Sequence, residues 1–266
     1  MMNLTDTVKQ LLIINVLFFI GSYFVPQANE LLSLHYFESN GFKFWQPITH
    51  MFMHGSLMHI FFNMFALISF GTALEHLWGV KKFLFFYFSC GIGAALVHSG
   101  VNYFEIHSLL NQLENTSITS ADIYTILNTD FVSGNQYYGK LLYENAAITF
   151  DRLKIGDVDF ELLFNAAVRT QSVAVGASGA IYGLLVAFAF MFPNAELMMM
   201  FIPVPVKAKY FVPVIVLLDL FSGVTGISLF GGGNIAHFAH VGGALIGFIM
   251  MWFWKKNQFD KNRWDR

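Results

Sequence analysis

The sequence predicts an all-α polytopic membrane protein, a bundle of six transmembrane helices with one polar segment inserted on the extracytoplasmic side. Of its 266 residues, 56% are hydrophobic and only 12% are charged, whereas a soluble domain carries about 25% charged residues. The mean hydropathy is +0.55. Apolar windows long enough to cross a bilayer lie near residues 9–25, 57–79, 82–103, 171–192, 208–227 and 235–254.

Composition also excludes several classes of site and partner. The formal net charge of −2 gives no reason to expect a nucleic-acid partner. Cys90 is the single cysteine, which excludes an intramolecular disulfide and a multi-cysteine zinc site. No cofactor is expected. The first apolar run, Leu11 to Val25, lacks a small-residue cleavage site and is therefore expected to be a retained span.

Basic residues decide the expected orientation in the lipid bilayer. Six spans put both termini on one side, and cytoplasmic loops are enriched in Lys and Arg. We therefore expect both termini to be cytoplasmic, in a bacterial cytoplasmic (inner) membrane because no transit peptide is evident. The basic residues on this face are Lys9, Lys81, Lys82, Lys207, Lys209, Lys255, Lys256, Lys261, Arg263 and Arg266.

A polar stretch, residues 104–170, separates the third and fourth windows and is expected to be exported. A weak helical period covers Asp159 to Arg169, and Ser120 is a candidate cap for a short helix from Asp122 to Leu127. We interpret the stretch as a loop packed over the outer face; the alternative is a separate binding domain.

Two of the predicted spans each carry a chemically active residue at the same depth. Ser178 lies in Gly-Ala-Ser-Gly at the mouth of the fourth, and His240 lies in Ala-His-Val-Gly-Gly at the mouth of the sixth. Both precede the far end of their span by about fifteen residues, or roughly 22 Å at about 1.5 Å per residue. In a hydrocarbon core about 30 Å thick they would face each other roughly 8 Å below the outer surface. A hydroxyl and an imidazole there predict a serine hydrolase site inside the membrane.

Glycines follow both residues at helical spacing. Gly179 and Gly183 lie in the fourth span, and Gly243 and Gly247 lie in the sixth. Such small-xxx-small faces let transmembrane backbones approach closely, which a Ser–His pair requires. On these residues alone, the alternative that the glycines and Ser178 serve only packing stays open.

The second span adds polar residues that favour a function. His59 and Asn63 are spaced i, i+4 on one helix face, and Asn63 is level with Ser178. Polar side chains in lipid are costly and usually functional, and these two offer N–H donors where an oxyanion would form. His50 and His54 lie nearer the outer surface; we interpret them as interfacial polar residues, with the lining of a water path as the alternative.

Together these pieces resemble the rhomboid family of intramembrane serine proteases. The resemblance covers all six spans but not residues 104–170. The matching residues are His50, His54, His59, Asn63, Gly176, Ala177, Ser178, Gly179, Tyr182, Ala239, His240, Gly243 and Gly247.

The resemblance implies a role for each of the central residues. Ser178 would be the nucleophile and His240 its base, with Tyr182 stacked against the imidazole. His59, Asn63 and the Ser178 backbone N–H would form the oxyanion hole. The substrates would be transmembrane proteins, cut near the extracytoplasmic face. The chain departs from the family pattern at Trp45-Gln46, where a Trp-Arg pair is common, and in the length of residues 104–170.

Other polar and glycine residues are assigned structural interpretations. Asp219 is interpreted as an interhelical hydrogen-bonding residue and a poor third catalytic carboxylate, and Glu75 as structural. His237 is interpreted as surface-facing, with a polar neighbour of the site as the alternative. Gly223 and Gly226, with the glycines at 231–233, could instead let the fifth span move to admit substrate.

Two rival functions remain. One is a histidine-based membrane metal protein, against which stand the lack of a His-Glu-x-x-His motif and the scarcity of buried carboxylates. Its candidate ligands are His50, His54, His59, His237 and His240. The other is a catalytically inactive rhomboid-like protein that binds membrane proteins without cutting them; the presence of both Ser178 and His240 argues against it.

Overall fold

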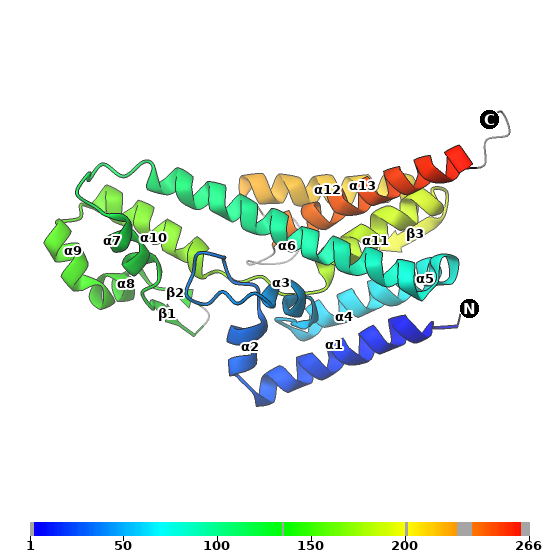
Figure 1. Cartoon of the computed structure of the whole chain (residues 1–266), viewed down its shortest axis with the longest axis horizontal. Helices are drawn as coiled ribbons and strands as arrows, with labels where there is room; N and C mark the ends of the chain where they lie inside the picture. The colour runs from blue at the N-terminus through cyan, green and yellow to red at the C-terminus, as the bar shows by residue number, and fades with distance from the viewer. Residues whose placement is uncertain (1–2, 135, 200–201, 228–235, 262–266) are drawn as a thin grey trace. The chain divides into compact units, whose positions relative to one another are not determined.

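The computed structural model describes residues 3–134, 136–199, 202–227 and 236–261 (Figure 1). The chain divides into two compact units. The first, here the membrane unit, comprises residues 1–33, 47–98 and 175–266. The second, here the insertion unit, comprises residues 34–46 and 99–174.

The protein is an all-α polytopic membrane protein. Among the described residues, five helical stretches are long and apolar enough to cross a membrane: α1 (Asp6–Phe24), Leu57–Trp78, α6 (Val80–Leu110), α12 (Ala208–Thr225) and the first part of α13 (His237–Lys261). Leu57–Trp78 consists of α4 (Leu57–Ala66), the π-helical turn η2 (Leu67–Gly71) and α5 (Thr72–Trp78). The start of α1 and the end of α13 lie at the same end of the membrane unit (Figure 1).

The fourth predicted span differs most from expectation. The window 171–192 is not one helix, because α10 (Asp157–Gln171) ends where the window begins and α11 (Ser178–Met191) starts seven residues later. Gly176, with φ of +118°, breaks the helix in a conformation that side chains rarely adopt. The 14 residues of α11 reach about 21 Å, less than the thickness of a bilayer core. The third span, in contrast, is longer than predicted and continues to Leu110.

Short elements connect the spans of the membrane unit. Helices α2 (Gln27–Leu32) and α3 (Gln46–Thr49) and the 3₁₀ turn η1 (His50–Phe52) lie between α1 and α4. The antiparallel hairpin of β3 (Glu196–Met199) and β4 (Ile202–Lys207) lies between α11 and α12, with Glu196 opposite Lys207.

The core of the membrane unit is centred on α11. Eight of its 14 residues are buried, among them Leu184 and Ala187, which are fully inaccessible. Phe83, Phe86 and Tyr87 of α6 belong to the same core cluster. A helix buried on most of its surface needs apolar residues on every side, which explains why α11 has no polar face.

The helices α11 and α13 touch through their glycines. A Cβ added to Gly243 would lie 1.8 Å from the carbonyl oxygen of Gly179, and one added to Gly247 would lie 2.8 Å from the Cα of Gly183. Cβ atoms do not occur at such distances, so only glycine is compatible with this approach. The two backbones therefore meet along the small-residue faces that the spacing predicts.

Glu75 has the structural role expected of it. The carboxylate Oε2 accepts hydrogen bonds from the Thr5 hydroxyl and, at 3.2 Å, from the Val8 backbone N–H. Val8 lies in the first turn of α1, where backbone N–H groups have no intrahelical partner. Glu75 of α5 thus caps the N-terminus of α1.

The insertion unit is helical and has its own core, so the interpretation of residues 104–170 as a loop is wrong. It contains α7 (Ser120–Leu127), α8 (Gly139–Asn145), α9 (Ala147–Leu153), α10 and the two-residue strands β1 (Val132–Ser133) and β2 (Gln136–Tyr137). Their buried apolar side chains form one cluster that includes Ile126, Phe131, Leu142, Phe150 and Leu163.

Local capping in the insertion unit corrects one expected detail. The helix expected from Asp122 to Leu127 is present, but its N-cap is Thr119 and not Ser120. Thr119 and Asp122 form a reciprocal capping box, because the carboxylate at the third helical position reaches back to the cap N–H. These bonds, together with the Arg152 guanidinium, hold the pKa of the Asp122 carboxyl below its usual range.

Gln46 takes over part of the role that a loop-holding arginine would have. Its side chain is fully buried; Oε1 accepts a hydrogen bond from the His35 N–H at 3.2 Å, and Nε2 donates one to the Gly41 carbonyl at 2.9 Å. The departure from the Trp-Arg pattern therefore leaves the 35–46 segment tied together by a neutral amide.

Replacing Gly243 by alanine tests the helix contact. The new methyl would overlap the Gly179 carbonyl, and overpacking of this kind costs about 1–3 kcal/mol or more. We expect a matching loss in unfolding free energy, measured in mixed micelles. The control is Gly21→Ala in α1, where nothing lies within 4 Å of the added Cβ. An equal effect of both substitutions would contradict the contact.

Candidate active site

Ser178 is the first residue of α11, and the chain before it is held in place by the backbone. The Gly176 N–H donates a hydrogen bond to the His50 carbonyl at 2.9 Å. Ala177 is the N-cap of α11. The first N–H groups of a helix lack intrahelical acceptors, so the backbone around Ser178 presents free donors at the positive end of a helix dipole.

His240 lies on the first turn of α13 with its ring between Ser178 and Tyr182. Its Nε2 is 2.8 Å from the Ser178 Oγ. The Tyr182 ring stacks on the imidazole, with centroids 4.3 Å apart and planes inclined by 11°. The expected pairing of hydroxyl and imidazole, and the expected stacking of Tyr182, are thus both present in the geometry.

Asp219 of α12 completes a chain of hydrogen bonds. Its Oδ1 lies 3.1 Å from His240 Nδ1, and its Oδ2 accepts a hydrogen bond from the Tyr182 hydroxyl. A carboxylate only accepts, so the proton of His240 sits on Nδ1 and Nε2 is left as the acceptor that faces the Ser178 hydroxyl. The prediction of an interhelical hydrogen bond is confirmed, and the Asp219 carboxylate lies beside His240 although it comes from a different span.

His237 also differs from expectation. It was expected at the surface, yet its side chain is only 14% exposed and its Nδ1 lies 2.6 Å from the same Asp219 Oδ1. His237 and His240 are three residues apart and share a helix face, which was a signal available in the sequence. What the sequence could not provide was the direction in which α12 turns Asp219.

His59 and Asn63 of α4 lie against the Gly176 backbone. A Cβ on Gly176 would lie 2.6 Å from His59 Nε2 and 3.4 Å from Asn63 Nδ2. The Asn63 Nδ2 is buried and has no hydrogen-bond partner among the described residues. A buried donor left unsatisfied costs about 1–3 kcal/mol, so this amide is a candidate donor for an acceptor that lies outside the described residues.

His50 and His54 are buried within the fold. Their exposed fractions are 5% and 4%. The His54 ring meets the His59 ring edge-on with centroids 5.0 Å apart, and its Nδ1 lies 3.3 Å from the Phe52 carbonyl oxygen. Burial, with the neighbouring His59 as a second cause, lowers the pKa of His54 to about 4.

The glycines proposed for movement of the fifth span have other roles where they are described. A Cβ on Gly223 would lie 3.1 Å from the Phe238 ring, so this glycine gives α12 close contact with α13. Gly226 ends α12 in the left-handed conformation. Residues 231–233 lie outside the described residues.

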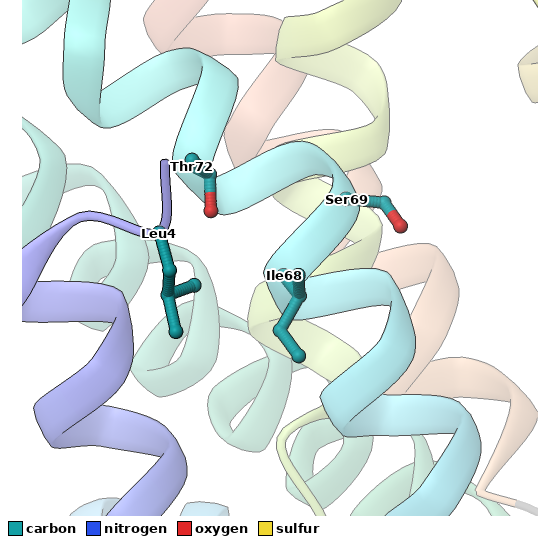
Figure 2. A pocket seen from close by; sticks show the side chains of 4 residues that line it. All are labelled: Leu4, Ile68, Ser69 and Thr72. Carbon is teal, nitrogen blue, oxygen red and sulfur yellow. The ribbon is translucent and has the colours of Figure 1, made fainter. Parts of the chain in front are cut away.

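A separate pocket lies between the first and second spans. It is lined by Leu4, Ile68, Ser69 and Thr72, and Figure 2 shows Ser69 pointing away from Leu4. None of these residues contributes to the site around Ser178.

The low pKa of His54 predicts acid sensitivity. The folded state favours neutral His54, so this contribution to stability is present above the ordinary pKa of about 6.5 and is lost as the pH falls toward about 4. Between pH 7 and 5 we expect a loss of about 2 kcal/mol. Unfolding titrations of the wild type and His54→Gln measure it; a wild-type slope that the substitution leaves unchanged would exclude His54 as its source.

The sequence matches a known protein family and two curated relatives. The rhomboid domain family matches residues 41–107 and 155–257, and the gap between the two matched stretches falls inside the insertion unit. The chain is 32% identical over 117 residues to the mitochondrial rhomboid protein 1 of Saccharomyces cerevisiae, covering 43% of this chain and 30% of that protein. It is 26% identical over 227 residues to an uncharacterized mitochondrial rhomboid protein of Schizosaccharomyces pombe, covering 80% of this chain and 52% of that protein.

The chain thus spans about half, or less, of the length of these two curated relatives. The family match covers most of the membrane unit, including every residue of the site described above. This chain belongs to the rhomboid family.

Proposed function

We propose that this protein is an intramembrane serine endopeptidase that cleaves transmembrane segments of membrane proteins near their extracytoplasmic ends. The observation that carries the proposal is the 2.8 Å approach of His240 Nε2 to Ser178 Oγ at the start of a short apolar helix. Rhomboid family membership supports the same reaction class.

In the proposed reaction, His240 Nε2 takes the Ser178 proton while Oγ attacks the scissile carbonyl carbon. The amine leaves with the proton that His240 returns, and water then hydrolyses the acyl-enzyme by the same route. Asp219 acts as a positioning residue. It holds the Nδ1–H tautomer of His240 and stabilises the imidazolium that forms.

The oxyanion of the tetrahedral intermediate would be bound next to Gly176. Asn63 Nδ2 supplies a buried donor with no partner among the described residues. His59 and the Ser178 backbone N–H are the other donors in this proposal. Donors fixed before the charge develops need no reorganisation, which is why such sites stabilise transition states strongly.

A substrate helix enters with its peptide bonds already hydrogen-bonded, so it must unwind locally before a carbonyl reaches Ser178. The shortness of α11 supports a site close to one membrane surface, where water can replace the lost hydrogen bonds. We therefore expect cleavage at a small residue followed by helix-weakening residues.

We propose the orientation that the basic residues predict, with both termini cytoplasmic, in a bacterial cytoplasmic membrane. Lys82 Nζ lies 4.1 Å from the centroid of the Trp254 ring and 5.5 Å from that of Trp78. A lysine among tryptophans is typical of a membrane–water interface, and the excess of lysine and arginine at this end supports it as the cytoplasmic one. The two curated relatives are named as mitochondrial proteins, and that location belongs to them.

A cleavage assay with purified protein and a single-pass model substrate tests the function. We expect the wild type to cut the substrate, and Ser178→Ala to lower the rate by about 10⁴-fold or more. An uncut substrate with the wild type would favour the inactive binder. Cleavage that survives in Ser178→Ala would place the activity elsewhere.

Replacing Asn63 by alanine tests the oxyanion donor. One such donor is typically worth about 2.7–4 kcal/mol, so kcat should fall by about 10²–10³-fold, less than on loss of Ser178. The matched control is Asn15→Ala, since Asn15 is also a buried asparagine in a span but donates to the Leu11 carbonyl. Equal losses in both variants would indicate a general packing effect.

Replacing Asp219 by asparagine tests the positioning role. The neutral amide no longer stabilises the His240 imidazolium, and kcat should fall by about 10²–10⁴-fold with KM little changed. The pH profile of kcat should also shift in Asp219→Asn. A purely structural role would instead lower the thermal stability and leave the pH profile of the remaining activity unchanged.

A further inference from the structure

Two imidazole rings lie within hydrogen-bonding distance of the same carboxylate oxygen of Asp219. Both Nδ1 atoms, from His237 at 2.6 Å and His240 at 3.1 Å, point at Oδ1. One donor atom from each of the three residues lies within 4.8 Å of the other two. The side chains of Asp219 and the two histidines are 10–14% exposed, so the cluster is largely enclosed but not sealed.

Two imidazole nitrogens and a carboxylate oxygen are ligands that Zn²⁺ prefers. Ligands about 2.0–2.1 Å from a tetrahedral ion lie about 3.3 Å from one another. The His240 distance of 3.1 Å is close to this value, and the His237 distance of 2.6 Å would lengthen when an ion binds. The Tyr182 hydroxyl donates a hydrogen bond to Asp219 Oδ2. Hydrogen bonds of this kind orient the carboxylate ligands of metal sites.

We propose that Asp219, His237 and His240 form a reversible site for a borderline divalent cation such as Zn²⁺, and that an ion bound there switches the protease off. The ion would be an inhibitor and not a cofactor. Three protein ligands leave a fourth position for water, which suits a site from which the ion can leave.

The inhibition follows from the position of one proton. In the hydrogen-bonded state His240 carries its proton on Nδ1, leaving Nε2 free to accept the proton of Ser178. A cation can bind Nδ1 only through the nitrogen lone pair, which is free only when Nδ1 carries no proton. The proton therefore moves to Nε2, and the ring stays neutral because it neither gains nor loses a proton. Nε2–H then can only donate to Ser178 Oγ, and the base is lost.

The inhibitory effect rests on the proposed protease function, but the binding of the ion does not. Binding is therefore measured first on Ser178→Ala, with Co²⁺ absorption as the probe and Zn²⁺ as competitor. We expect one ion per chain. His237→Asn, made in this background, keeps an amide able to donate to Asp219 but lacks the imidazole nitrogen, and should weaken binding by at least about tenfold.

The matched control for binding is His76→Asn, which removes an exposed histidine that lies 3.2 Å from the Asn3 carbonyl oxygen. It should bind Co²⁺ as Ser178→Ala alone does. Two results would overturn the site. One is the absence of a Co²⁺ absorption spectrum, and the other is equal Co²⁺ affinity of the His237→Asn and His76→Asn variants.

Cleavage by the protein with Ser178 intact then tests the switch. Zn²⁺ should abolish cleavage, EDTA should restore it, and His237→Asn should cleave without Zn²⁺ while resisting at least about tenfold more of it. Cleavage that Zn²⁺ leaves unchanged at a concentration that fills the site would overturn the switch alone. A protein that binds Co²⁺ as expected but never cleaves would instead count against the protease function, with the ion site retained.

Discussion

The direct contact of the α11 and α13 backbones is the constraint on which the rest of the structure depends. Gly179 and Gly243 meet so closely that no side chain fits between them. Ser178 directly precedes one of these glycines, and His240 precedes the other by one helical turn. The distance between hydroxyl and imidazole is therefore set by main-chain packing, which varies less than side-chain rotamers, and a larger residue at either glycine would move both groups apart.

Burying so many polar groups in an apolar bundle is costly, and the site divides them into two kinds. The Asp219 carboxylate accepts hydrogen bonds from Tyr182 and His240, which fixes the His240 imidazole in one tautomer. Asn63, which lies against the Gly176 backbone, has a buried donor without a partner in the described part of the chain. Under the proposed function, Asp219 positions His240 as the general base, and Asn63 donates a hydrogen bond to the oxyanion. The same concentration of ligand atoms around Asp219 is what would expose the base to a competing cation.

The sequence predicted the parts of this arrangement that depend on local pattern. Apolar windows located the spans, and glycine spacing identified the faces of α11 and α13 that touch. The break before Ser178 was missed because the window 171–192 contains no charged residue, and only the backbone conformation around Gly176 reveals that a new helix starts there. The contact of His237 with Asp219 was not predicted because the rotation of α12 about its axis is decided by tertiary packing. Thr119 was missed as a cap because it and its neighbour Ser120 are both good capping residues, and only the backbone geometry distinguishes them.

The central claim is that His240 activates Ser178, and labelling by a serine-directed fluorophosphonate tests it most directly, because it needs no substrate helix and no gate. The account predicts that the wild type is labelled on one residue, identified by mass spectrometry as Ser178. It also predicts that His240→Ala, still folded by thermal unfolding, is labelled far more slowly. Undiminished labelling of Ser178 in His240→Ala, or a label on another residue, would contradict the account.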